Sequence, residues 1–134
     1  MPDPHPLLDE LRSLGLPAGD YAVFGSGPLL ARGWIADAGD LDVVARGRAW
    51  TRAAELGPLV HLAEWNVDVI EIGSAITIGR TWAIGDVDVD DLIDSAEWID
   101  GLPFARLELV ADYKRVAGRP KDRDHLAIIE RHSS

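Results

Sequence analysis

The stretch VFGSGPLLARGWIADAGDLDVVA, residues 23–45, contains the pattern that decides the fold. A short apolar run ends in a Gly-Ser pair, a helix-like segment follows, and an Asp-Leu-Asp triplet opens a second apolar run. Strand side chains alternate between faces, so Asp40 and Asp42 point the same way while the leucine between them points into the core. Because two neighbouring carboxylates repel each other, we expect a cation between them.

The Gly-Ser pair supplies the complementary half of a site. Gly25 lets the backbone approach a phosphate group, and a helix that begins at Ser26 offers free amides and a positive dipole end. The chain has no cysteine, and an acidic, thiol-free group of oxygen ligands favours Mg²⁺ or Mn²⁺. The two halves together predict phosphoryl or nucleotidyl transfer, in which a metal and a phosphate are held side by side.

The periodicity of the remaining chain predicts one α/β domain spanning 1–134, with a mixed sheet flanked by helices and a helical C-terminus. We expect a core at about 19–75 and closing helices at about 104–132. The expected helices are 6–16, 26–34, 46–57, 102–118 and 119–132. The expected strands are 20–25, 40–45, 58–65 and 66–73, and the acidic stretch 86–101 is expected to be a loop with a short strand near 92–99.

The charge is unevenly distributed along the chain. The formal net charge is -10, yet residues 112–134 hold six Lys or Arg against four Asp or Glu. An acidic body repels nucleic acid in general, so no general nucleic-acid binding is expected. It does not repel a nucleotide that arrives with a divalent metal, and the basic C-terminal segment can meet its phosphates locally.

Membrane association is not expected from the sequence. No apolar run approaches the roughly 20 residues needed to cross a bilayer. The N-terminal MPDPHPLLDE is acidic and proline-rich, unlike a signal peptide. Together with the absence of cysteine, these features predict a cytoplasmic protein.

The order of strand, Gly-Ser, helix and Asp-x-Asp resembles the nucleotidyltransferase superfamily, the fold of DNA polymerase beta and of the minimal nucleotidyltransferases in toxin–antitoxin systems. GSGPLLARGWIADAGDLDVV is most similar to the bacterial branch that includes AbiEii-type proteins, and YKRVAGRPKDRDHLAII is similar to the closing helices of that branch. The resemblance covers about 6–130. It implies an enzyme that transfers a nucleoside monophosphate from an NTP to an acceptor hydroxyl on a protein, an RNA or a small molecule.

The resemblance also implies the catalytic and metal-binding residues. Asp40 and Asp42 would hold Mg²⁺ or Mn²⁺, and a third carboxylate on a neighbouring strand would complete the site. Asp68 and Glu71 are the candidates, and strand alternation places them on opposite faces. We choose Asp68 because it matches the family's apolar-Asp-apolar-apolar pattern. A different strand register would make it Glu71.

NTP-binding roles follow from the same resemblance for Gly25, Ser26, Arg32, Lys114 and Lys121. Minimal nucleotidyltransferases of the antitoxin type usually carry a basic residue soon after Gly-Ser, where this chain has Gly-Pro-Leu. Arg32 would take that role or would simply be exposed. Lys114, Lys121 and Arg119 would meet the triphosphate or the base. Alternatively, these three residues form a basic face on the terminal helices.

Two other interpretations of the sequence remain open. The chain lacks the additional domain with which larger relatives hold an acceptor, so it is alternatively an inactive nucleotide- or protein-binding module, such as an antitoxin-like partner. Separately, the acidic stretch 86–97 has Asp86, Asp88, Asp90 and Glu97 at EF-hand calcium positions. Asp91 stands where the turn-forming glycine belongs, so an acidic solvated loop is the favoured interpretation.

Overall fold

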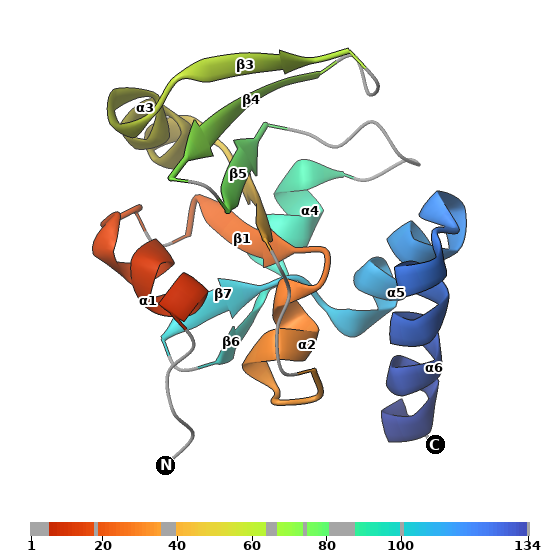
Figure 1. The fold of residues 1–134 in the computed structure, drawn as a ribbon. Helices are drawn as coiled ribbons and strands as arrows, with labels where there is room; N and C mark the ends of the chain where they lie inside the picture. Colours follow the sequence, from red (N-terminus) through yellow and green to blue (C-terminus); the bar gives the residue numbers. More distant parts are fainter. Residues whose placement is uncertain are drawn as a thin grey trace.

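A mixed β-sheet with helices on both faces forms the protein, as the computed structural model shows (Figure 1). The structure describes residues 6–17, 19–35, 40–63, 67–73, 75–80, 88–99 and 101–133. Its fold class is the predicted one, a mixed α/β domain with a helical C-terminus.

The sheet has seven strands in the order β3-β4-β5-β2-β1-β7-β6. Only two of the neighbouring pairs are parallel, β1 with β7 and β2 with β5. The strands are β1 (Tyr21–Phe24), β2 (Leu41–Ala45), β3 (Leu59–Leu62), β4 (Val67–Ile72), β5 (Ile76–Gly79), β6 (Glu97–Ile99) and β7 (Leu102–Phe104).

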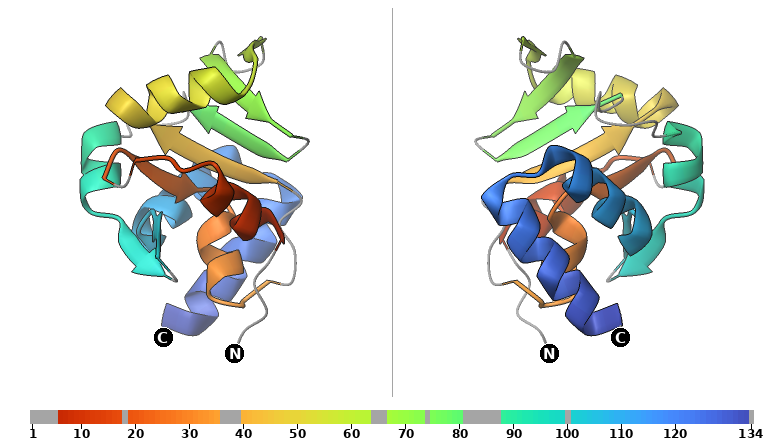
Figure 2. Two further views of the ribbon diagram at one scale, coloured as in Figure 1. Left: turned by 90° about the vertical axis from the view of Figure 1, so that its left-hand side faces the viewer. Right: turned by 90° about the vertical axis from the view of Figure 1, so that its right-hand side faces the viewer.

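The described residues form six helices, with α1 and α3 on one side of the sheet and α5 and α6 on the other (Figure 2). They are α1 (Pro6–Ser13), α2 (Gly27–Ala31), α3 (Gly47–Leu56), α4 (Val89–Asp94), α5 (Leu107–Ala117) and α6 (Pro120–Ser133). Helices α5 and α6 lie side by side, joined at Gly118, whose φ of +61° makes the left-handed cap that glycine favours.

The alternation of side chains along β2 divides the interior into two cores. Leu41 and Val43 are fully buried on the face that carries α1 and α3. Val44 is buried on the other face, with residues of α2, α4, α5 and α6. Burying each of these side chains stabilises the fold by about 1.5–3 kcal/mol. The register therefore fixes Asp42, which alternates with Leu41 and Val43, on the face of α5 and α6.

Three segments differ from the sequence-based expectation. The strand β5 was not predicted. The acidic stretch expected to be a loop contains α4, because Asp88 caps its N-terminus by accepting from the Asp91 amide at 3.2 Å and because Leu92 and Ile93 are buried. The segment 102–118 was predicted to be one helix, but it begins with β7, whose pairing with both β1 and β6 outweighs helix propensity.

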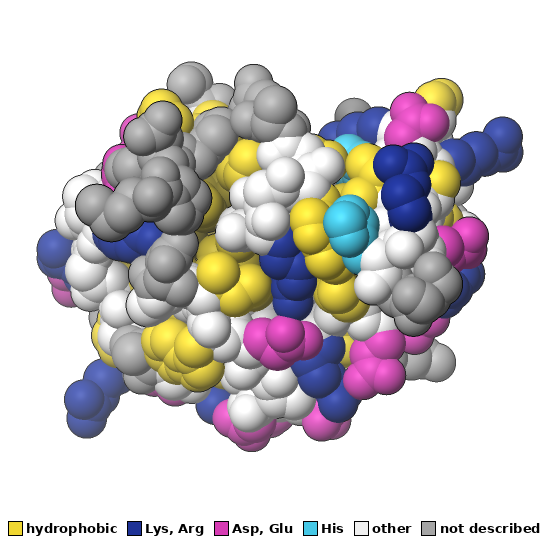
Figure 3. All heavy atoms as spheres, turned by 90° about the horizontal axis from the view of Figure 1, so that it is seen from below, with side chains coloured by type: hydrophobic (Ala, Val, Ile, Leu, Met, Phe, Trp, Pro, Cys, Tyr) yellow, Lys and Arg dark blue, Asp and Glu magenta, His cyan; other side chains and the backbone are white. Residues whose placement is uncertain are grey.

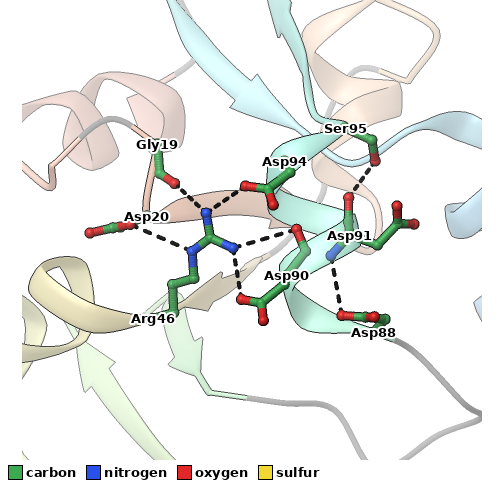
Figure 4. A network of polar contacts seen from close by, with 8 residues as sticks. All are labelled: Gly19, Asp20, Arg46, Asp88, Asp90, Asp91, Asp94 and Ser95. Atoms are coloured by element: carbon green, nitrogen blue, oxygen red, sulfur yellow. Dashed lines mark hydrogen bonds and ion pairs between the residues drawn. The ribbon is translucent and has the colours of Figure 1, made fainter.

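The acidic stretch and the start of α3 are joined through one guanidinium group (Figure 4). Arg46 donates to Asp90 Oδ1 at 2.7 Å, to Asp94 Oδ1 at 2.6 Å and to the Gly19 carbonyl at 3.0 Å. Its Nε also faces Asp20 Oδ1 at 3.5 Å. The hydrogen bonds that Arg46 donates to the Asp94 and Asp90 carboxylates raise its pKa. The network connects α4 to β1 and α3.

The calcium interpretation of 86–97 finds no support in this network. Asp88 is a helix cap and Asp90 lies in α4 against Arg46, while Glu97 pairs with Arg32 at 2.8 Å. Asp86 lies outside the described residues. The carboxylates of this stretch that the structure describes therefore have structural partners.

Replacing Arg46 with methionine is expected to lower the free energy of unfolding by about 1–3 kcal/mol, because several charge-assisted hydrogen bonds between three elements are lost. Urea denaturation measures the change. Arg115→Met is the matched control, since its pair with Asp112 is exposed and local, and it should cost no more than about 0.5 kcal/mol. Equal effects of the two changes would contradict the proposed role of the network.

Candidate functional site

The turn after β1 brings backbone directly over a carboxylate. Phe24 pairs with Asp42 across β1 and β2, and Gly25 follows with a φ of +65°. A Cβ atom on Gly25 would lie 2.9 Å from Asp42 Oδ2, closer than such atoms approach in proteins. Both the positive φ and this contact require glycine. The sequence-based pairing of the Gly-Ser turn with the second aspartate of the triplet is therefore a spatial contact.

Ser26 connects this turn to the C-terminal helices. Lys114 Nζ donates to Ser26 Oγ at 3.2 Å, although the two residues are 88 positions apart in the chain. His125 Nδ1 lies 3.1 Å from Ser26 Oγ and 3.0 Å from Lys114 Nζ. These three polar atoms form a close triangle between α2, α5 and α6.

Lys114 is the most buried cation in the described structure, with 1% of its side chain exposed. It faces Asp122 Oδ1 at 3.3 Å, and the Asp122 side chain is completely buried. Burial lowers the pKa of Lys114, and the Asp122 charge partly opposes that shift. Burial by itself raises the pKa of Asp122. Hydrogen bonds from Arg119, whose Nε lies 2.7 Å from Asp122 Oδ2, and the charge of Lys114 outweigh burial, so the net effect is a lowered pKa. The carboxylate is thus held ionised between two cations.

The half-buried Asp42 is where the acidic and basic parts of the chain meet. Burial, and then the nearby charge of Asp40, raise its pKa to about 6. The charges of Lys121, Arg119 and Lys114 act in the opposite direction and lower the pKa of Asp42. The site therefore combines an acidic pair with cations from the C-terminal segment that contains α5 and α6.

The structure brings most of the predicted site residues together. Gly25, Ser26, Asp42 and Lys114 are linked by the contacts above, and the charges of Asp40 and Lys121 act on Asp42. Lys114, which was alternatively expected to lie on a basic face of the terminal helices, is buried.

Asp68 does not face Asp42. Across the sheet Asp42 pairs with Thr77 and Thr77 pairs with Glu71, so Glu71 shares the row and the face of Asp42. Asp68, an odd number of positions away on the same strand, points to the opposite face. Its exposed carboxylate lies 2.9 Å from His61 Nδ1 on β3. The insertion of β5 between β2 and β4 determines this register, which favours the other candidate, Glu71.

Arg32 is also held away from the turn. Its guanidinium donates to the Pro28 carbonyl at 2.9 Å and to Glu97 at 2.8 Å, and it lies 5.5 Å from the centre of the Trp34 ring. These contacts connect α2 to β6. The predicted phosphate role of Arg32 therefore has no support in this geometry.

The face of the protein shown in Figure 3 carries acidic and basic side chains interleaved with hydrophobic ones.

Two site residues were not chosen from the sequence. Asp122 forms salt bridges with Lys114 and Arg119, and its side chain is completely buried. His125 is partly buried against Ser26. A signal for both is present, since Asp122, His125 and the buried Ile129 follow the helical spacing of one inward stripe.

The acidic pair fits a divalent cation in part. Among the described residues, no group of three or more histidine and carboxylate side chains is arranged to hold a metal ion. Asp40 and Asp42 supply two hard oxygen ligands, and Mg²⁺ commonly uses one or two carboxylates, with water and substrate phosphate completing its shell. Burial and then the charge of Asp40 raise the pKa of Asp42, and a bound dication would act against both effects.

Comparisons with known proteins add no further assignment. No protein-family model matches the chain, and no curated protein or solved structure matches it. No helix in the described ranges is long and apolar enough to cross a membrane.

The raised pKa of Asp42 predicts a pH dependence of stability in metal-free buffer. The folded value of about 6 exceeds the ordinary 3.8, so the folded protein binds this proton more tightly than the unfolded chain does. The Asp42 contribution to the free energy of unfolding therefore falls as pH rises from about 4 to 6 and then stays constant.

Urea denaturation in EDTA tests this dependence. Asp42→Asn should be more stable than the parent above pH 6 by roughly 1–3 kcal/mol, with the difference disappearing below pH 4. Comparing the two proteins at each pH cancels the opposite contribution of Asp122. A difference that does not vary with pH would show that Asp42 titrates normally.

Proposed function

We propose that the protein binds a nucleoside triphosphate with Mg²⁺ or Mn²⁺ and transfers its nucleoside monophosphate to an acceptor hydroxyl. The observation that carries this proposal is the buried Lys114, whose ammonium group contacts Ser26 in the turn beside Asp42. A cation, a glycine turn and a carboxylate pair are the parts that positioning and charge neutralisation of a triphosphate require.

The phosphate-binding half consists of groups from both ends of the chain. Gly25 would offer its backbone amide to a phosphate oxygen, and the Ser26 hydroxyl would become available by exchanging its hydrogen bond with Lys114. Lys114 supplies a fixed positive charge that Asp122 orients. Lys121, whose side chain is exposed on α6, adds a second positive charge that acts on Asp42.

The carboxylate half consists of Asp40 and Asp42, which would hold the divalent ion. When bound, that ion supplies charge neutralisation of the triphosphate. The transfer itself forms a bond between the acceptor oxygen and the α-phosphorus and breaks the bond to the β-phosphate oxygen, releasing pyrophosphate. The acceptor proton would pass to Glu71, which lies in the same cross-strand row as Asp42 at a Cα distance of about 10 Å, two strand spacings.

A non-catalytic nucleotide-binding module is the second candidate. It is favoured by one observation, that the described residues place no third carboxylate directly beside the acidic pair. Such a protein would bind the metal–nucleotide complex through the same groups and act as a nucleotide sensor or as an antitoxin-like partner. Binding is common to both candidates, and turnover separates them.

Asp42→Asn is expected to weaken Mg²⁺-dependent binding of an NTP at least about tenfold, because an amide does not replace the charge of a metal-bound carboxylate. Isothermal titration calorimetry with each of the four NTPs, with and without Mg²⁺, measures the effect. Asp112→Asn is the control, since Asp112 is exposed and paired with Arg115 on α5. Unchanged affinity in Asp42→Asn would refute the assignment of the metal site.

Transfer activity distinguishes Glu71 from Asp68. With α-labelled NTP, Mg²⁺ and a cell lysate as the source of acceptor, Glu71→Gln should lower labelling of macromolecules at least about tenfold, since the loss of a general base commonly costs more than that. Asp68→Asn should leave labelling near the parent level. The reverse result would show that Asp68 completes the site, and the absence of any labelling by the parent protein would favour the binding module.

A further inference from the structure

A pocket lies on the opposite face of the sheet from Asp42. It is a pocket of about 540 Å³ formed by the exposed side of α3 and the residue that follows β5. Helix α3 packs through Ala49 and Ala53 onto the core that contains Val43, and Asp42 alternates with Val43 to the other face. The pocket is therefore separate from the triphosphate site.

The lining of this pocket is strongly basic. Arg48, Arg52 and Arg80 contribute three guanidinium groups, against one carboxylate from Glu55. Outside residues 112–134 the chain has only seven basic residues against nineteen acidic ones, so three of these seven gather at one pocket. Like charges at this density are unfavourable unless an anion neutralises them.

Two of the three guanidinium groups, those of Arg80 and Arg52, are held by neighbouring residues. Arg80 stacks over the Trp50 ring at 5.2 Å from its centre, an arrangement that fixes the side chain without neutralising it. Arg52 donates from Nε to the Leu14 carbonyl at 3.3 Å and faces Glu55 at 3.4 Å. Arg48 is exposed at the start of the helix and lines the same pocket.

We propose that this arginine pocket binds a phosphomonoester dianion. Three guanidinium groups less one carboxylate leave an excess of two positive charges, which matches the charge of -1.5 to about -2 on a phosphate monoester near pH 7. The planar forks of arginine suit the tetrahedral phosphate oxygens. A volume of about 540 Å³ accommodates a ligand as large as a nucleoside monophosphate.

Calorimetry at low salt in EDTA tests the proposal, with inorganic phosphate, AMP and adenosine as probes. EDTA removes the divalent ion on which binding at Asp42 depends, and low salt avoids screening of exposed charges. Phosphate and AMP should bind the parent protein, whereas adenosine should not. Arg48→Ala combined with Arg80→Ala should weaken AMP binding at least about tenfold, because two charge-assisted contacts are lost.

Two controls separate this pocket from the triphosphate site. Arg115→Ala removes an exposed arginine of α5, and Lys121→Ala removes a cation near Asp42. Both should keep parental affinity for AMP. Loss of AMP binding in Lys121→Ala with retention in the double variant would overturn the proposal, as would equal binding of AMP and adenosine or no binding of either.

The source of the phosphomonoester is tested with a short oligoribonucleotide that carries either a 5′-phosphate or a 5′-hydroxyl. Tighter binding of the phosphorylated strand than of AMP would identify an RNA end as the ligand. Tighter binding of AMP would identify a free nucleotide. Equal binding of the two strands, in both the parent and the double variant, would contradict recognition of a terminal phosphate.

Discussion

The buried ammonium group of Lys114 is the contact on which the candidate site depends. It contacts Ser26 of the first strand–helix turn, Asp122 at the start of α6 and His125 one turn further along that helix. Removing an ammonium ion from water costs several kcal/mol, and this cost is recovered only where a charge and further hydrogen bonds meet it. Asp122 supplies that charge, and Arg119 in turn supplies a second partner for Asp122. The two ends of the chain are thereby joined at one point.

A second constraint lies in the central strands. β2 has a neighbour on each side, and its apolar side chains are completely buried, yet Asp42 interrupts that pattern beneath the backbone of Gly25. A carboxylate with a pKa raised to about 6 destabilises the folded protein at neutral pH when no cation is bound. Proteins commonly retain such a cost at functional sites, where the same charge is used for binding. The apolar packing of β2 on both faces provides the stability that this arrangement needs.

Residues 23–45 were sufficient to predict the centre of the fold, because strand alternation, the Gly-Ser turn and the Asp-Leu-Asp triplet act locally. The choice of the third carboxylate, which would complete the site with Asp40 and Asp42, depends on strand pairing between residues far apart in the sequence. It depends on β5, four residues whose short apolar run carried no clear signal, and that strand places Glu71 rather than Asp68 in the row of Asp42. The likeness to nucleotidyltransferases favoured Asp68 through a short pattern, but a pattern of alternating residues leaves the register undetermined.

The other differences have the same origin in tertiary contacts. α4 forms because a capping aspartate and a pair of buried side chains outweigh the charge repulsion of an acidic run, and Arg46 then neutralises two of its carboxylates. Arg32, which resembles a phosphate ligand in the sequence, is bound by a glutamate that is far away in the chain. Lys114 could be placed near phosphates from the sequence, but the Asp122 partner that permits its burial follows from the packing of α5 against α6.

A crystal structure with Mn²⁺ and a non-hydrolysable NTP would show where the metal and the triphosphate bind, because the anomalous signal of manganese locates the metal independently of the phosphates. We expect a metal peak within coordinating distance of both Asp40 and Asp42, with triphosphate oxygens beside the Gly25 backbone and the ammonium group of Lys114. A metal bound elsewhere, or a triphosphate seated away from Lys114, would contradict this expectation.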